Sequence, residues 1–122
     1  MTAKVADRIA YPMRSTAPSV VHHWIKVVFG SGAVSSYTAS PGCTFTRDGA
    51  GEYSLSFPPC YSVLGIHAQY VGAAAVNRVP QVETYDAGTG DADINLNAVA
   101  TPTDGVDGDE MFVLIMCQGT DR

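Results

Sequence analysis

Charged residues and long hydrophobic runs are both scarce in this sequence. Only 16% of its 122 residues are Asp, Glu, Lys or Arg, a low fraction for a surface that faces water alone. No apolar run approaches the roughly 18 residues of a membrane span, and the segment Met1–Asp7 lacks the apolar block of a secretory signal. We therefore expect a soluble protein without membrane contact, not exported by the usual signal, part of whose surface is covered by a partner.

Cysteines are few, and no two of them form a close pair. Cys43, Cys60 and Cys117 are an odd number without the short spacings of zinc or redox motifs. Free and mostly buried thiols in a reducing compartment are the simplest interpretation.

Charge divides the chain into a basic arm and an acidic body. Residues 1–19 contain three basic residues against Asp7 and are interrupted by Pro12 and Pro18, whereas residues 20–122 contain four basic and eleven acidic residues, a net charge of −7. An extended arm of this length reaches about 60 Å; a frayed terminus is the alternative. The negative body argues against nucleic acid as a partner, because phosphates require a basic surface.

Residues 20–122 show the period-2 alternation of β-strands, separated by turn residues at short intervals. We expect an all-β fold: a single compact β-sandwich or barrel of about eight strands, preceded by the extended N-terminal arm. The predicted strands are residues 24–29, 33–38, 43–47, 52–57, 63–70, 79–85, 92–98 and 111–117.

The alternation also predicts which side chains face the core. Asn95 and Asn97 are expected to point outward, and the run Met111–Cys117, apolar without alternation, predicts a central strand buried on both faces. The side chains expected to point inward from two other strands are Leu64, Ile66, Ala68, Tyr70, Ala92, Ile94, Leu96 and Ala98.

Motifs for catalysis are missing: the sequence has no phosphate-binding glycine loop, no Gly-x-Ser-x-Gly elbow and no His-Glu-x-x-His helix. A nucleophile–base pair formed in space stays open, and packing or surface roles are the simpler interpretation. Adjacent histidines of a strand point to opposite faces and make a poor chelate. The residues that such a pair would use are Cys43, Cys60 or Ser62 with His22, His23 or His67.

Two groups of carboxylates lie among glycines and are candidates for calcium ligands or for turns. The spacing of an EF-hand is absent from both, and Asp and Gly are the ordinary residues of tight turns. We therefore expect turns, and we predict no metal or cofactor. The two groups are Asp104, Asp107, Asp109 and Glu110, and Asp86, Asp91 and Asp93.

Three segments of the chain, Phe29–Ala33, Arg47–Pro58 and Gly108–Ile115, resemble small virion structural proteins of tailed bacteriophages. The resemblance covers roughly residues 25–117 and rests on hairpin glycines and strand alternation. It implies a capsid decoration (cement) protein, or another small head or tail component, that acts without catalysis. Such a protein is assembled in the host cytoplasm, binds the major capsid protein of the virion, and commonly forms trimers on local three-fold positions.

The arm suits such a role, because binding to a lattice gains avidity when several arms engage at once. We expect it to bind the major capsid protein or a neighbouring copy, with basic residues pairing with carboxylates and apolar residues filling pockets. A neutral face of Ser, Thr and Asn would form the trimer contact or the outer surface. A phage tail, fibre or receptor-binding β module is the alternative. The predicted contact residues of the arm are Lys4, Arg8, Ile9, Tyr11, Met13 and Arg14.

Overall fold

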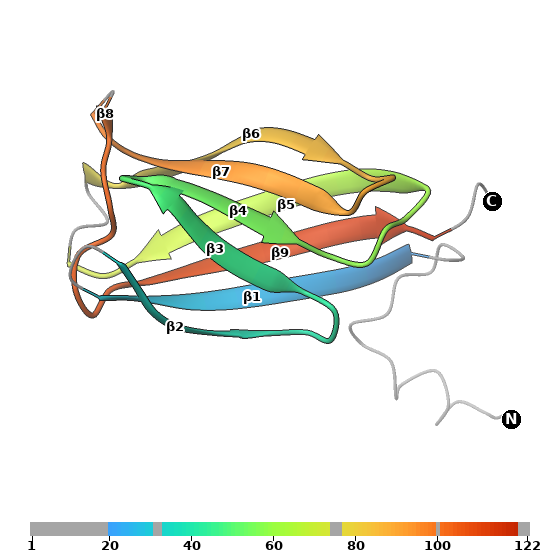
Figure 1. Ribbon diagram of the computed structural model, residues 1–122, viewed down its shortest axis with the longest axis horizontal. Coiled ribbons are helices and arrows are strands. Elements are labelled where there is room, and N and C mark those ends of the chain that lie inside the picture. The colour runs from blue at the N-terminus through green and yellow to red at the C-terminus, as the bar shows by residue number, and fades with distance from the viewer. Residues whose placement is uncertain (1–19, 31–32, 74–76, 100, 120–122) are drawn as a thin grey trace, which may run out of the picture.

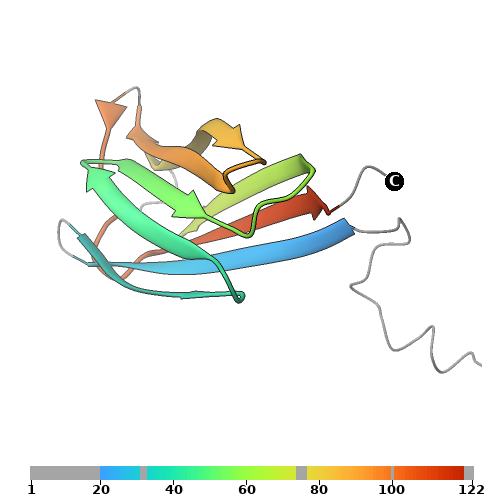
Figure 2. The ribbon, with the colours of Figure 1, turned by 45° about the vertical axis from the view of Figure 1, so that its right-hand side comes forward.

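The computed structural model describes residues 20–30, 33–73, 77–99 and 101–119. These residues form two antiparallel sheets that pack face to face, so the fold is an all-β sandwich (Figures 1 and 2). The predicted all-β fold class is confirmed, and of the two predicted architectures the structure is the sandwich. It has nine strands among the described residues, where about eight were expected. The predicted arm, residues 1–19, lies outside the described residues.

The first sheet has the strand order β2-β1-β9-β5, with every neighbouring pair antiparallel. Its strands are β1 (Val20–Gly30), β2 (Ala33–Ala39), β5 (Ser62–Val71) and β9 (Glu110–Gln118). The last strand of the chain, β9, therefore lies between β1 and β5 in the middle of the sheet.

The second sheet has the order β3-β4-β7-β6, and the short strand β8 pairs with β7. Its strands are β3 (Thr44–Gly49), β4 (Glu52–Ser56), β6 (Val79–Asp86), β7 (Asp91–Ala98) and β8 (Thr101–Pro102). The predicted hairpin between residues 43–47 and 52–57 is confirmed as the β3–β4 pair, in which Phe45 lies opposite Leu55.

The turns follow from local chemistry. Between β6 and β7 the carboxylate of Asp86 accepts hydrogen bonds from the N–H groups of Gly88 (2.8 Å) and Thr89 (3.2 Å), the local capping that favours Asp in turns. Gly90 closes this turn at φ 74°, a left-handed conformation that glycine adopts without strain. The chain then enters β7 opposite the end of β6.

The core lies between the two sheets and is built by alternate residues of the central strands. Four strands, β1, β4, β7 and β9, contribute the largest fully buried side chains. Phe29 connects the layers, with its ring centroid 5.7 Å from that of Tyr53 and 5.8 Å from that of Tyr70. The core residues with the least exposure are Ile25, Val27, Phe29, Tyr53, Leu55, Ile94, Leu96, Met111, Val113, Ile115 and Cys117.

The inward set predicted for β5 is wrong at one position. Ile66, Ala68 and Tyr70 pack on or in the core as expected, but Leu64 is 51% exposed and Val63 packs against the core instead. A register shift between Val63 and Gly65 causes the difference, because a bulge inserts one unpaired residue and breaks the alternation.

The predicted burial of residues 111–117 on both faces is also wrong. The strand is central, as expected, and Met111, Val113, Ile115 and Cys117 are buried. Phe112 and Leu114 nevertheless remain exposed, because no second layer of described residues covers the outer face of this sheet.

In the described part of the chain no helix is long and apolar enough to cross a membrane.

Candidate functional site

The outer face of the β2-β1-β9-β5 sheet carries a patch of apolar side chains. Its outward side chains come from β1, β9 and β5, where register places Trp24 opposite Leu114 and Lys26 opposite Phe112. Trp24 is 45% exposed and Leu114 39%. We call this surface the apolar face and define it by Trp24, Val28, Val71, Phe112, Leu114 and Met116.

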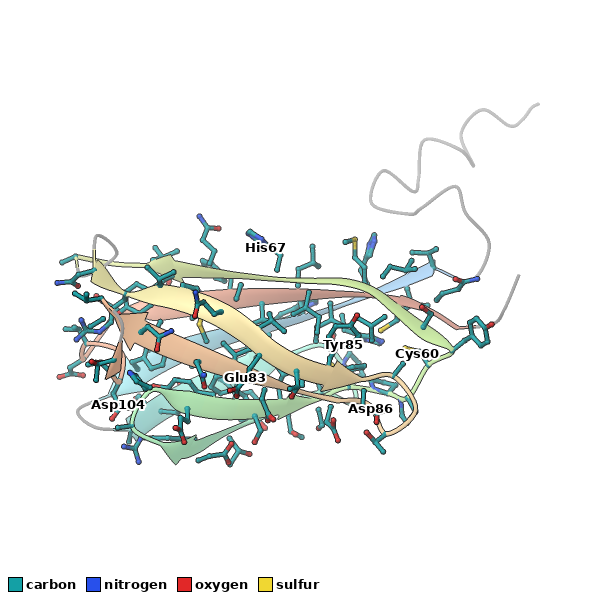
Figure 3. All side chains as sticks on the ribbon, turned by 90° about the horizontal axis from the view of Figure 1, so that it is seen from above. Cys60, His67, Glu83, Tyr85, Asp86 and Asp104 are labelled. Atoms are coloured by element: carbon teal, nitrogen blue, oxygen red, sulfur yellow. The ribbon has the colours of Figure 1, made fainter. Side chains whose placement is uncertain are left out.

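Polar side chains border the apolar face, and the charged pair among them neutralises itself. Register places His22, His67 and Gln69 on the same side as Met116, Leu114 and Phe112. The ammonium of Lys26 lies 3.6 Å from a carboxylate oxygen of Glu110 and 5.7 Å from the centroid of the Phe112 ring. His67 lies opposite Leu114 on the same side, and Figure 3 shows its ring pointing away from the sandwich. The charges of Lys26 and Glu110 cancel, so this face carries almost no net charge.

The outer face of the β3-β4-β7-β6 sheet has the opposite chemistry. Two open hollows lie on it, one of ≈ 320 Å³ and one of ≈ 190 Å³, and their walls are hydroxyls, amides and five carboxylates. No Lys or Arg is among the residues that line them. We call this surface the acidic face and define it by Thr44, Thr46, Asp48, Glu52, Ser54, Ser56, Glu83, Asp91, Asp93 and Asn95.

The expected neutral face of Ser, Thr and Asn is therefore wrong in its charge. These side chains do share one face, since Thr46 lies opposite Ser54 and Ser54 opposite Asp93. The alternation of β7, however, places Asp91 and Asp93 on the same side as Asn95. A face with five carboxylates is negative at neutral pH.

Asp104 joins the loop before β9 to strand β3, to the turn between β3 and β4, and to strand β4. Its carboxylate accepts hydrogen bonds from Nε (3.0 Å) and a terminal nitrogen (2.9 Å) of Arg47, from the N–H of Gly51 (3.0 Å) and from the hydroxyl of Tyr53 (3.0 Å). Its carbonyl oxygen accepts from Nε of Arg78 at 2.9 Å. The bidentate Arg47 is the main cause of a lowered pKa for Asp104.

The same network raises the pKa of Tyr53 above its usual value, first through burial and then through the neighbouring Asp104 carboxylate. A second carboxylate of the loop is used in a similar way: the hydroxyl of Tyr70 donates to Asp109 at 2.8 Å and accepts from the N–H of Val106 at 3.0 Å. Both carboxylates hold the loop against the core.

The carboxylates that were candidates for calcium ligands are thus spread over the molecule. Asp104 and Asp86 lie at opposite ends of the sandwich (Figure 3), and Asp86 holds its own turn, as the sequence predicts. Asp91 and Asp93 accept hydrogen bonds from Thr89 and Thr84. Within residues 20–30, 33–73, 77–99 and 101–119, no three His, Cys, Asp or Glu side chains are arranged to hold a metal ion.

The candidate nucleophiles and bases are not brought together. His22 lies opposite Met116 and His23 opposite Ile115, so the two point to opposite faces as predicted. Burial, and then the charge of His22, lowers the pKa of His23. Among the described residues no hydrogen bond joins a histidine to a cysteine thiol or a serine hydroxyl; Cys60 donates instead to the carbonyl of Ser62 at 3.4 Å.

All three thiols are free, and Cys43 and Cys117 are buried, as the sequence predicts. Burial raises the pKa of Cys117 to about 12, and the neighbouring Cys60 adds to the shift. A thiol with such a pKa is a poor nucleophile at neutral pH.

The six predicted contact residues of the arm lie outside the described residues, so the structure places none of them. The apolar face was not predicted from the sequence, although one signal was present. In the segment Trp24–Phe29 the buried positions are Ile25, Val27 and Phe29, and the same alternation puts Trp24 on the other side of the strand.

Comparison of the chain with protein-family models, with curated proteins and with solved structures found no match.

Proposed function

We propose that this protein is a non-enzymatic virion structural protein of a tailed bacteriophage, a capsid decoration or cement protein that binds and stabilises the lattice of the major capsid protein. The observation that carries the proposal is the apolar face: a small rigid sandwich leaves Trp24, Phe112 and Leu114 exposed on one sheet. A patch of this kind suits a protein that works through contacts with other subunits, whether those of the capsid or further copies of itself. The resemblance of its hairpins to small virion proteins supplies the biological setting.

The carboxylates of the loop before β9 support this role indirectly. Asp104 and Asp109 bind Arg47, Tyr53 and Tyr70, so their hydrogen-bonding capacity stabilises the fold. A protein that stabilises a shell must keep its own shape under load. The network that ties the loop to both sheets serves that requirement.

The arm, residues 1–19, supplies the second contact in this proposal. Its charge of +2 complements carboxylates of the capsid or of a neighbouring copy, and Ile9, Tyr11 and Met13 supply apolar contacts. Linking the arm to the body raises the effective concentration of the second contact once the first has formed. We place the protein in the virion, after assembly in the host cytoplasm, as a homo-oligomer, with a trimer expected from the resemblance.

Deletion of residues 1–18 tests this proposal on expanded phage heads. The truncated protein should occupy far fewer sites than the full chain at equal concentration, measured by quantitative gel or mass analysis of purified heads. A matched variant with Lys4, Arg8 and Arg14 changed to Gln keeps the length of the arm and isolates its charge. Undiminished occupancy by the truncated protein would refute the role of the arm, and failure of the full chain to bind heads would refute the proposed function.

One observation favours the alternative of a tail, fibre or receptor-binding module. Tyr61 and Tyr85 are 62% and 57% exposed, and their segments meet where the N–H of Cys60 donates to the carbonyl of Ala87 at 2.9 Å. Exposed aromatics at the end of a sandwich are typical of sugar-binding loops. Binding of the isolated protein to host cells or glycans, with no binding to heads, would favour this alternative.

A further inference from the structure

The apolar face departs from the usual pattern of an antiparallel sheet. Such a sheet, with one face on the core, normally exposes polar side chains on the other. Here Trp24, Phe112 and Leu114 cover adjacent positions of β1 and β9, and each is more than a third exposed. We propose that a second copy of this chain covers the apolar face.

Charge limits the orientations in which two copies can meet. Residues 20–122 carry a net charge of −7, which opposes the approach of two copies in most orientations. The apolar face is the exception, because its only charged pair, Lys26 and Glu110, neutralises itself. Association through this face keeps the acidic faces of the two copies on the outside and apart.

The size of the face is sufficient for a specific contact. The whole outer face of this sheet includes, besides the apolar face, the polar positions Ser36 and Thr38 of β2. Four strands spaced about 4.8 Å apart, with about eight residues each at about 3.3 Å per residue, span an area of about 500 Å². Two copies that cover this whole outer face would bury about 1,000 Å² in total, which reaches the minimum size of about 1,000 Å² expected of a biological interface. The aromatic and methionine content of the face matches the composition of interface cores.

The backbone of Trp24, near the centre of this face, is bound to the residue that follows β2. Its backbone N–H donates to the hydroxyl of Ser40 at 3.0 Å, and its backbone carbonyl accepts from the N–H of Ser40 at 2.9 Å. The side chain is half-exposed, and tryptophan is among the residue types that most often dominate interface energies.

This inference assigns a contact to the homo-oligomer of the proposed function and rests on that part of it alone. It does not rest on the expected trimer, because two copies that share the same face associate as a pair. The test therefore uses the full-length purified protein without phage heads. Failure to bind heads leaves the self-association measurable, and failure to self-associate leaves head binding measurable.

Sedimentation velocity across a concentration series measures the association of the wild type, Leu114→Glu and Thr46→Glu. Leu114→Glu places a charge on the apolar face, and Thr46→Glu places the same charge on the exposed acidic face. We expect the wild type and Thr46→Glu to be oligomeric, with Leu114→Glu associating at least about thirtyfold more weakly, as for the loss of a central interface residue. Phe112→Gln serves as a second variant if Leu114→Glu does not fold.

Fluorescence gives an independent readout, because Trp24 is the only tryptophan in the sequence. Dilution of the wild type should shift its emission to longer wavelength as the face becomes exposed, at the same concentration at which sedimentation reports dissociation. A wild type that is monomeric throughout overturns the proposal. So does an oligomer that Leu114→Glu and Phe112→Gln leave intact, or a monomer whose apolar face binds only the phage head.

Discussion

Asp104 and Arg47 form a bidentate ion pair across 57 positions of the sequence, with N···O distances of 3.0 and 2.9 Å. Arg47 belongs to β3 and Asp104 to the loop before β9, so the pair joins the second sheet to the entry into the first. Because the same carboxylate also accepts from Gly51 and Tyr53, its removal would leave several donors without a partner.

Replacement of Asp104 by Ala should therefore destabilise the fold. We expect a loss of about 2 kcal/mol in the free energy of unfolding, since hydrogen bonds to charged groups contribute about that much and partly buried donors are left unsatisfied. Urea denaturation measures it. Asp107→Ala, an exposed carboxylate of the same loop, is the matched control and should change stability little. Equal effects of the two substitutions would contradict the role assigned to Asp104.

Acid should weaken the same network. The pKa of Asp104 is lowered in the folded protein, chiefly by Arg47, from the ordinary value of 3.8. A lowered pKa means that the folded state favours the ionised carboxylate; its contribution is complete above the ordinary value and is lost as pH falls through the lowered one. The melting temperature of the wild type should therefore drop more steeply below pH 4 than that of Asp104→Asn. Parallel curves for the two proteins would show that other carboxylates determine the loss of stability in acid.

Gly105→Ala should destabilise the protein by a steric route. A Cβ atom at this buried position would overlap the ring of Phe29 in the middle of the core. Overpacking of this kind costs about 1–3 kcal/mol. Gly88→Ala is the matched control, because its nearest neighbour would be an Asp86 oxygen at an ordinary contact distance of 3.4 Å. Thermal unfolding of both variants measures the difference, and a neutral Gly105→Ala would argue against this packing.

The three thiols should differ in reactivity. Burial raises the pKa of Cys117 to about 12, and Cys43 is also buried, whereas Cys60 is only half-buried. Titration of the native protein with a thiol reagent at pH 8 should modify Cys60 first, and all three thiols should react after unfolding. Cys60→Ser should remove the fast phase. Fast labelling of Cys117 in the native protein would contradict its burial.

The strands could be predicted from the sequence because their signals are local. Alternation located the core positions of β7, and turn residues located the β3–β4 hairpin. The exposed position of Leu64 could not be predicted, since a bulge shifts the register without leaving a mark in the hydrophobic pattern. The pairing of Asp104 with Arg47 could not be predicted either, because it depends on how distant segments meet in space.

The strand β9 shows a further limit of sequence-based prediction. A continuous apolar run is expected where both faces of a strand are buried. The sequence does not say whether the residues that bury the second face belong to the same chain. In the described residues only one face is covered, and Leu114 remains exposed beside the buried Ile115. The contact residues predicted for the arm stay predictions.

Substitutions at adjacent positions of β9 can distinguish the contributions of its two faces to stability. Ile115→Ala creates a cavity in the core and should reduce the free energy of unfolding by about 3 kcal/mol at any protein concentration. Leu114→Ala removes an outward side chain, so it should cost little in dilute solution. Its cost should grow with concentration, because association stabilises the folded wild type by mass action. Denaturation of the three proteins at several concentrations measures this. A cost for Leu114→Ala that is large and constant would place Leu114 in the core of a single chain, against the observed exposure.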